Sequence, residues 1–461
     1  MKTLLKKVIA VAALIFLMMT VSGCVGATPI EDMYALPQLS NEYFELQEAV
    51  DQVIAAGAEY LAPTSGSNRS SVQLVDIDTD GTDEAVACFK TDEVGAPLKI
   101  YIFDNDGSSD GAYEQTLVIE GEGTSIESIT YVDMDGDNIS EVVVGWQISD
   151  EMKLLCVYLI KDLQAAPIVR TEYTTYVTHK MGGDLGGERG SDVITISTSD
   201  SSEQGKVTAY SLMQDGEVVS SETELSRGIL ALSRVRTGYL NNGEAAIYVE
   251  STMGSSVITD IIAYKRNGLS YELENVTLDQ ETKVSTSTTR PYSVYSTDIN
   301  NDGIIEVPHP ELLTSQSGTT SYYILKWHSY DDSGSRQLVL TTYHNFSDGW
   351  YLALPDDWVG YITIRRDDTQ TGERAVVFSY INGDGTFTDF LKIYALTGAN
   401  REERAYQPNR FILKDNSDRN GTIFAAEILE SAYEDIPLDV SADEIRSNFN
   451  EIYAEWLTGE I

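Results

Sequence analysis

The chain has 461 residues, with 31 Lys and Arg against 73 Asp and Glu and a formal net charge of −42. This charge disfavours nucleic acid and anionic lipid head groups as partners, because phosphate binding needs clustered Lys and Arg. The chain is too long for one compact core and has a length typical of repeated units.

The amino terminus has the pattern of an export signal. Three lysines among the first seven residues precede the apolar residues 8–21, and small residues then lead to Cys24. This stretch is too short for an ordinary membrane-spanning helix. It resembles a bacterial lipoprotein signal over residues 1–23, which implies that Cys24 is lipidated and holds the protein on the outer face of the cytoplasmic membrane. A simple secretion signal with an incidental cysteine is the alternative.

Residues 24–40 are expected to form a lipidated tether, and residues 41–62 an amino-terminal helical segment. Leu46, Val50, Val53 and Ile54 recur at helical spacing before a stop at Gly57. We expect this apolar stripe to pack on the main domain.

Three acidic loops repeat one template, with oxygen-bearing side chains at positions 1, 3, 5 and 9. This spacing suits a turn that wraps a hard cation, and calcium is the expected ion. The helix-loop-helix calcium site also carries a bidentate Glu at position 12, which is missing here, so the acid at position 9 must replace it. The predicted ligands are, in chain order, Asp76, Asp78, Asp80 and Glu84, then Asp133, Asp135, Asp137 and Glu141, then Asp298, Asn300, Asp302 and Glu306.

Runs rich in β-formers flank the loops, so each loop is predicted to join two strands. The alternative is that Asp, Asn and Gly only make tight turns there. That reading is strongest for the third loop, where Asn300 lowers the charge and Pro308 shortens the next strand.

The loop spacing predicts a repeat of about 55 residues. The first two loops begin 57 residues apart, and the second and third 165 apart, or three steps of 55. Decayed copies are expected at 184–192, which keeps acids at positions 1, 5 and 9, and at 236–244, which has lost them. Further steps reach Asp356 and Asp415. The sequence therefore predicts an all-β fold, a β-propeller of seven blades between residues 63 and 438 with short terminal helices.

At this point the chain resembles the FG-GAP/VCBS-like repeats of integrin-type β-propellers and bacterial surface proteins. The resemblance rests on the three loops and the period, and spans about residues 70 to 435. It implies calcium held between the strands of a blade.

Residues 439–461 are predicted to form a carboxyl-terminal helix. Ser441 and Glu444 match a capping box, and an apolar stripe runs from Ile445 towards Leu457. Cys88 and Cys156 lie in apolar strand runs and are expected to be buried free thiols, with an inter-blade disulfide as the alternative.

No pattern in the sequence points to catalysis. The four histidines are scattered, and no H-E-x-x-H pairing or phosphate-binding glycine loop occurs. We therefore interpret the chain as a cell-surface lipoprotein whose calcium-stabilised propeller binds a glycan or an envelope protein. A polysaccharide-acting lyase or hydrolase, or a structural assembly lipoprotein, remains the alternative, because one fold hosts many functions.

Overall fold

The computed structural model describes most of the chain after residue 40. The predicted signal 1–23, Cys24 and the tether 24–40 lie outside the described residues. No helix in the described part is long and apolar enough to span a membrane. The described residues are 41–105, 113–160, 166–182, 190–198, 204–267, 270–291, 294–316, 320–416 and 421–452.

Six antiparallel sheets follow one another along the described chain, and we call them blades 1 to 6. In blades 2, 3 and 4 the four strands pair in chain order, as in a meander, while β1 and β2 both pair with β3 in blade 1. The strands of blades 1 to 3 are β1 (Glu59–Tyr60), β2 (Val72–Val75), β3 (Glu84–Lys90), β4 (Leu98–Asn105), β5 (Tyr113–Gly121), β6 (Ser125–Val132), β7 (Glu141–Gln147), β8 (Lys153–Tyr158), β9 (Val169–Tyr173), β10 (Thr175–His179), β11 (Asp192–Ser197), β12 (Lys206–Leu212) and β13 (Val218–Glu224).

Blades 5 and 6 each have a fifth strand. In blade 5 the late strand β27 pairs with β21, and in blade 6 the order is β22-β23-β24-β26-β25. The strands of blades 4 to 6 are β14 (Ala231–Tyr239), β15 (Ala245–Met253), β16 (Ser256–Asn267), β17 (Ser270–Asn275), β18 (Val307–Leu312), β19 (Tyr323–Tyr330), β20 (Arg336–Asn345), β21 (Trp350–Ala353), β22 (Ile362–Gln370), β23 (Glu373–Ile381), β24 (Phe387–Leu396), β25 (Phe411–Asn416), β26 (Thr422–Ile428) and β27 (Phe449–Glu451).

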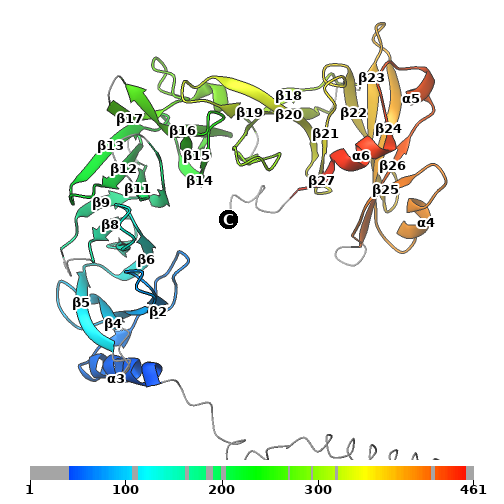
Figure 1. The fold of residues 1–461 in the computed structure, drawn as a ribbon. Helices are drawn as coiled ribbons and strands as arrows, with labels where there is room; N and C mark the ends of the chain where they lie inside the picture. The colour runs from blue at the N-terminus through cyan, green and yellow to red at the C-terminus, as the bar shows by residue number, and fades with distance from the viewer. Residues whose placement is uncertain are drawn as a thin grey trace, which may run out of the picture.

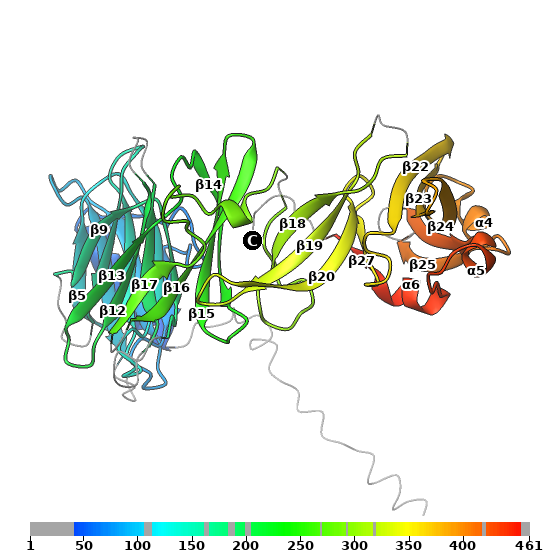
Figure 2. The same ribbon diagram turned by 90° about the horizontal axis from the view of Figure 1, so that it is seen from above.

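The blades stand side by side along an arc, with first strands such as β6 and β14 on the concave side and last strands such as β9 and β17 on the convex side (Figure 1). Seen from above, the sheets stack against one another in chain order (Figure 2). The predicted all-β fold of propeller blades is confirmed. The blades form an open arc, however, and not a closed ring.

Apolar cores lie between successive blades, and strand alternation assigns each side chain to one of them. In β7, Val142 and Val144 belong to the core shared with blade 1, whereas Val143 belongs to the core shared with blade 3. In β15, Ile247 faces blade 3 and Tyr248 faces blade 5. The second strands are therefore buried on both faces, which explains why their sequences are continuous apolar runs rather than alternating ones.

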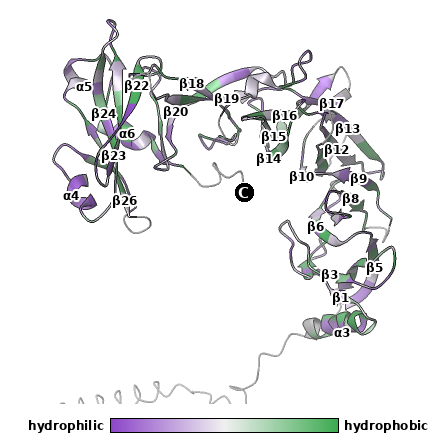
Figure 3. Ribbon diagram, turned by 180° about the vertical axis from the view of Figure 1, so that it is seen from behind, coloured by the Kyte–Doolittle hydropathy of each residue, from purple (hydrophilic) through white to green (hydrophobic). Residues whose placement is uncertain are grey.

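Helices cover the free faces of the two end blades. Helix α3 (Asn41–Ala55) packs Leu46, Val50 and Val53 against the outer face of blade 1, as its apolar stripe predicts. Helix α3 carries both hydrophobic and hydrophilic residues, as Figure 3 shows. At the other end, Ala405 of α4 (Arg401–Ala405) packs against strands of blade 6. These helices act as caps of the kind that repeat arrays need.

The predicted number of seven blades is wrong for the described residues, which form six. The last two steps of the 55-residue period fall at Asp356 and Asp415. Asp356 lies between β21 and β22, directly before blade 6, and Asp415 lies within β25 of the same blade. The two steps therefore mark one blade and not two. Blade 6 runs from Ile362 to Ile428 and contains α4, so it is longer than the repeat. The spacing of the loops therefore no longer predicts the number of blades once an insertion changes the length of one repeat.

In the described residues the carboxyl-terminal helix is shorter than predicted, and residues 453–461 of the predicted helix lie outside the described residues. The Ser441 side chain accepts a hydrogen bond from the Glu444 N–H, as the capping box requires, but α6 (Ala442–Asn448) ends after seven residues. The chain then forms β27, and Phe449 joins the core between blades 5 and 6. An open sheet edge at β21 thus overrides the helical pattern, because pairing there satisfies its backbone groups. The remaining short helices are η1 (Thr286–Thr288) and α5 (Ser431–Glu434).

Cys88 and Cys156 are buried free thiols, as predicted. Both lie in the core between blades 1 and 2. Burial raises the pKa of Cys88 to about 12, so this thiol is not a nucleophile at neutral pH.

The cap of blade 1 is testable. Replacing Leu46 with Ala should lower the free energy of unfolding by about 2–4 kcal/mol, because this side chain is 7% exposed and packs on blade 1. Phe44→Ala on the same helix is the control, since Phe44 is 65% exposed. Urea denaturation measures both, and equal effects of the two changes would contradict a capping role for α3.

Candidate functional site

The first two acidic loops occupy the same place in their blades, between the concave-side strand and the second strand, whereas the third lies between an isolated bridge at Thr297 and β18, the first strand of blade 5. The first loop joins β2 to β3, the second joins β6 to β7, and the third directly precedes β18. The acid at position 9 starts the second strand in the first two loops and immediately precedes β18 in the third. The predicted strand-to-strand setting is confirmed for the first two loops; no described strand precedes the third, where only the bridge between Thr297 and Glu306 joins the two ends of the loop.

One hydrogen bond recurs in all three loops. The carboxylate at position 9 accepts from the backbone N–H of position 2, at 2.6 Å for Ile77 to Glu84 and 2.9 Å for Met134 to Glu141. The third loop repeats it at 3.1 Å, from Ile299 to Glu306. The residue at position 2 is apolar and buried each time, in an inter-blade core for Ile77 and Met134 and against strands of blade 5 for Ile299. Each loop is therefore anchored at both ends.

The rest of each loop follows the same pattern. The carboxylate at position 1 accepts from the N–H of position 6, and Oδ1 at position 5 accepts from the N–H of position 7. Positions 4 and 6 have positive φ in every loop, which favours Gly and Asn there. These residues are Thr79 and Gly81, Gly136 and Asn138, and Asn301 and Gly303.

Two of the loops bring three carboxylates together. Ligand atoms of Asp76, Asp78 and Glu84 all lie within 4.8 Å of one another, and so do those of Asp133, Asp135 and Glu141. These are the acids at positions 1, 3 and 9. A hard cation takes such oxygen ligands, so the arrangement fits the predicted metal sites.

In the first and third loops, one carboxylate oxygen of the glutamate at position 9 has no hydrogen-bond partner. Glu84 is 5% exposed and Glu306 is 0% exposed. In each, Oε2 bonds to the loop backbone, while Oε1 is buried and has no hydrogen-bond partner; Asp76 Oδ1 is in the same state. Buried oxygens of this kind are costly unless they are paired, and a bound cation would pair them.

Burial also changes the acidity of these glutamates. It raises the pKa of Glu84, Glu141 and Glu306 to about 7 each, and the neighbouring aspartates add to the effect, while the backbone hydrogen bond opposes it. The loops therefore hold glutamates that, without a cation, titrate near neutral pH.

The remaining predicted ligands are placed differently. Asp80 and Asp137 lie outside the two carboxylate groups and bond to backbone N–H groups within their own loops. In the third loop, Asn300 Nδ2 donates to Asp302 Oδ2 at 2.8 Å. Among the described residues, three carboxylates converge in this way in the first two loops and not in the third.

The decayed copy in blade 3 is only partly described, because residues 183–189 lie outside the described ranges. Its acid Asp192 is buried and accepts from the Met181 N–H at 3.2 Å and from the Ser211 hydroxyl. Met181 therefore takes the part that the position 2 residue plays in the other loops, but eleven residues before the acid and not seven, whereas the predicted position 1 residue, Asp184, lies outside the described residues. In blade 4, Asn241 to Glu244 form a tight turn closed by Leu240 N–H to Glu244 O at 2.8 Å.

Neighbouring loops bond to each other across blades. Ser140 N–H donates to Ile77 O at 2.7 Å, and the Thr79 hydroxyl donates to Asn138 O at 3.0 Å. The second loop continues the chain of contacts, with Gly190 N–H donating to Met134 O at 3.1 Å. A Cβ on Gly190 would lie 2.0 Å from Asp133 O, so only glycine permits this approach. The loops thus connect blades 1, 2 and 3.

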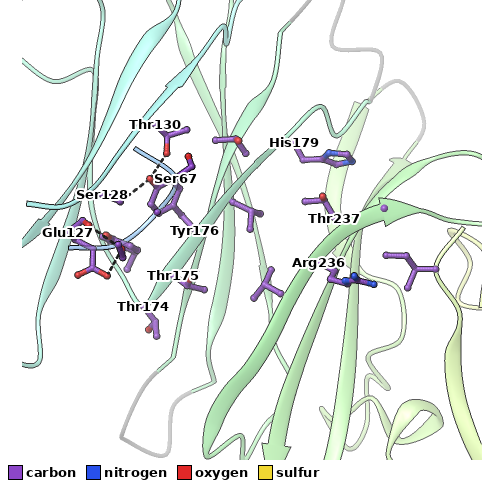
Figure 4. Close-up of a pocket in the computed structure, with 18 of the residues that line it drawn as sticks. Ser67, Glu127, Ser128, Thr130, Thr174, Thr175, Tyr176, His179, Arg236 and Thr237 are labelled. Atoms are coloured by element: carbon purple, nitrogen blue, oxygen red, sulfur yellow. Dashed lines mark hydrogen bonds between the residues drawn. The ribbon is translucent and has the colours of Figure 1, made fainter. Parts of the chain in front are cut away.

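A second feature, the concave-face pocket, lies on the first strands of blades 2, 3 and 4. It has a volume of about 870 Å³ and takes residues from β6, β10 and β14, from the segment 65–67 and from the third acidic loop. Figure 4 shows Glu127, Ser128 and Thr130 on one side and Arg236 and Thr237 on the other. The sequence did not predict this pocket, because its residues are brought together only by the curvature of the array.

Polar contacts join the side chains that line the concave-face pocket, both between first strands and with neighbouring segments. The Tyr176 hydroxyl lies 3.0 Å from Ser128 Oγ and 2.8 Å from Thr130 Oγ1 (Figure 4). Lys153 pairs with Glu127 at 2.7 Å. Arg236 Nη1 donates to Thr297 Oγ1 at 3.1 Å. Burial lowers the pKa of His179, so this imidazole is neutral at pH 7.

No family model matches this chain, and no curated protein matches it. Among solved structures it is similar to a putative 6-phosphogluconolactonase from Bacteroides uniformis, at 13% identity over 71% of this chain and 86% of the other, with a TM-score of 0.26. The WD40 domain of SCAP from fission yeast gives 10% identity over 81% and 77%, with a TM-score of 0.25. A periplasmic gluconolactonase from Pseudomonas aeruginosa gives 12% identity over 75% of this chain and 95% of the other, with a TM-score of 0.25. Likenesses at this level assign no activity to this chain.

The titration of the position 9 glutamate is testable in the presence of chelator. Its folded pKa is raised above the unfolded value near 4.5, so the fold binds this proton more tightly. Stability from Glu84 is then fully present below about pH 4.5 and is lost as the pH rises through about 7. Glu84→Gln keeps a side-chain oxygen that accepts from the Ile77 N–H and cannot ionise. The variant should therefore lack this pH-dependent fall in the free energy of unfolding, which we expect to be on the order of 2 kcal/mol.

The measurement is the free energy of unfolding of both proteins at pH 5 and pH 8 in chelator. The free energy of unfolding of the variant should rise relative to that of the native protein between pH 5 and pH 8. A difference between the two that does not change with pH would contradict the raised pKa.

Proposed function

We propose that this chain is an exported, lipid-anchored protein whose propeller blades are stabilised by calcium and bind an envelope or extracellular ligand, a glycan or a protein. The observation that carries the calcium assignment is the buried, unpartnered Oε1 of Glu84 beside Asp76 and Asp78. The acids at positions 1, 3 and 9 supply hard oxygen ligands, which calcium prefers over softer donors.

The similarity to FG-GAP/VCBS-like repeats belongs to this proposal. It is supported by the shared conformation of three loops and by the place of the first two between the first and second strands of a blade. Calcium in each loop would replace the proton on the position 9 glutamate and offset the repulsion among acids. Because the first two loops bond to each other, the ion would also hold blade 1 against blade 2.

Binding is favoured over catalysis by the carboxylates of the concave-face pocket. They are Glu127 and Asp298. Glu127 is paired with Lys153, and Asp298 accepts from the N–H groups of Asp302 and Gly303 in its own loop. Neither is placed as the free acid and base that glycoside hydrolysis needs.

Export and anchoring are supported by the sequence of residues 1–24 alone. Calcium is plentiful outside the cell, where even sites with dissociation constants of about 10⁻⁴–10⁻³ M are filled. An extracellular location and weak, structural calcium sites are therefore consistent with each other.

Calcium should raise the melting temperature of the full-length protein in detergent by several degrees over the value in chelator. A site filled at about tenfold excess over its dissociation constant adds on the order of 1.4 kcal/mol, and two sites add together. Asp76→Asn and Asp133→Asn should each remove part of the shift.

Asp384→Asn is the matched control, because Asp384 is a turn acid in the β23–β24 hairpin that bonds only to Thr386 and belongs to neither carboxylate group. Differential scanning calorimetry and metal analysis give the readout. A melting temperature that is the same with calcium and with chelator would show that the loops are ordinary turns.

The anchor is tested separately. Cys24→Ser should move the protein from the membrane fraction to the soluble exported fraction, because a single lipid-modified residue holds it there. Fractionation after labelling with a fatty-acid analogue measures both events. Cys88→Ser is the control, since Cys88 is buried and should affect neither. Label on the Cys24 variant would disprove the assignment.

A further inference from the structure

We propose that the concave-face pocket binds an oligosaccharide that carries a carboxylate group. This inference rests on the proposed ligand-binding function and names the ligand class and the site. It is carried by three features of the lining: its hydroxyl groups, one exposed aromatic ring and one cation that no carboxylate neutralises.

Hydroxyl side chains dominate the lining. Eight of the 22 lining residues are Ser or Thr, and the aliphatic ones are Val177, Val235 and Ile305. Sites for apolar ligands and for peptide side chains are mostly hydrophobic. Hydroxyls both donate and accept, as the hydroxyl groups of a sugar do, so this lining matches a polyhydroxylated ligand.

Tyr239 supplies an aromatic face in the same pocket. Its ring is 48% exposed and lies against His179 in an edge-on arrangement, with ring centroids 6.0 Å apart. Its backbone is fixed, because the Tyr248 hydroxyl donates to Tyr239 O at 3.1 Å and Ile305 N–H donates to the same oxygen at 3.4 Å. A ring held on a rigid strand gives contact area to a flat ligand face at low entropic cost.

Arg236 supplies the charge. Its Nη1 bonds to the neutral hydroxyl of Thr297, and no carboxylate of the described residues lies within ion-pair distance of it. The other lysine or arginine of the lining, Lys153, is already paired with Glu127. A guanidinium has five donors in a planar fork, so Arg236 retains donors for a ligand carboxylate.

The pocket volume sets the ligand size. About 870 Å³ lies near the upper end of the range for small-molecule sites and exceeds the space that one sugar ring fills. The hollow extends over three blades, from Glu127 on β6 to Tyr239 on β14, so an oligosaccharide lying across the first strands fits it better than a monosaccharide.

The test is isothermal titration calorimetry of the full-length protein in detergent and calcium, with two tetrasaccharides as probes. Tetragalacturonate carries carboxylates, and cellotetraose is its neutral counterpart. We expect tetragalacturonate to bind at least tenfold more tightly than cellotetraose. Arg236→Gln should remove that preference, and Tyr239→Ala should weaken the binding of both probes about tenfold or more.

The controls separate binding from folding. Tyr239→Phe keeps the ring and should keep binding, while Arg227→Gln and Tyr361→Ala change exposed residues outside the pocket and should have no effect. Calcium-dependent melting of each variant reports folding. Equal binding of both probes with no effect of Arg236→Gln would overturn the inference. Failure of both probes with an intact calcium-dependent melt would also overturn it, while leaving the proposed calcium-stabilised protein in place.

Discussion

The burial of the second strand of each blade on both of its faces is the constraint on which the rest of this structure depends. Strands β3, β7, β11 and β15 carry almost continuous buried residues, and alternate side chains enter two different cores. A sheet of this kind is unstable alone, because each core needs a neighbouring blade. The blades must therefore stack, and the two ends of the stack need covers, which α3 and α4 provide.

The same constraint shapes the acidic loops. The first two loops enter doubly buried strands, so Glu84 and Glu141 are carried into the interior with the strands that they start, and Glu306 is buried directly before β18. Its backbone hydrogen bond satisfies one oxygen and leaves the other, which is how a surface turn acquires a buried carboxylate. The raised pKa of these glutamates measures the cost of that position. A cation that binds there is linked to the packing of blades as well as to the turn itself.

The sequence predicted well where short-range rules apply. The capping box at Ser441, the apolar stripe of α3 and the grouping of the acids at positions 1, 3 and 9 in the first two loops follow from the sequence, because each depends on residues within one turn or one helix. The acids at position 5 do not join these groups. Prediction failed where distant segments compete. Blade 6 contains an insertion that breaks the 55-residue period, and the open edge of β21 draws Phe449–Glu451 out of the predicted helix. Asp192 is a third case, since its partner Met181 lies eleven residues away.

The all-β class of the fold and the acidic loops that join strands in blades 1 and 2 could be predicted from the sequence, because composition, periodicity and spacing along the chain carry that information. The tertiary structure alone decided the number of blades, the open arc with its helical caps and the concave-face pocket. Ser128, Tyr176 and Arg236 have no shared motif, and they line one pocket only because the first strands of three blades, β6, β10 and β14, lie side by side. Such proximity depends on how the blades pack and curve, which no local pattern of residues records.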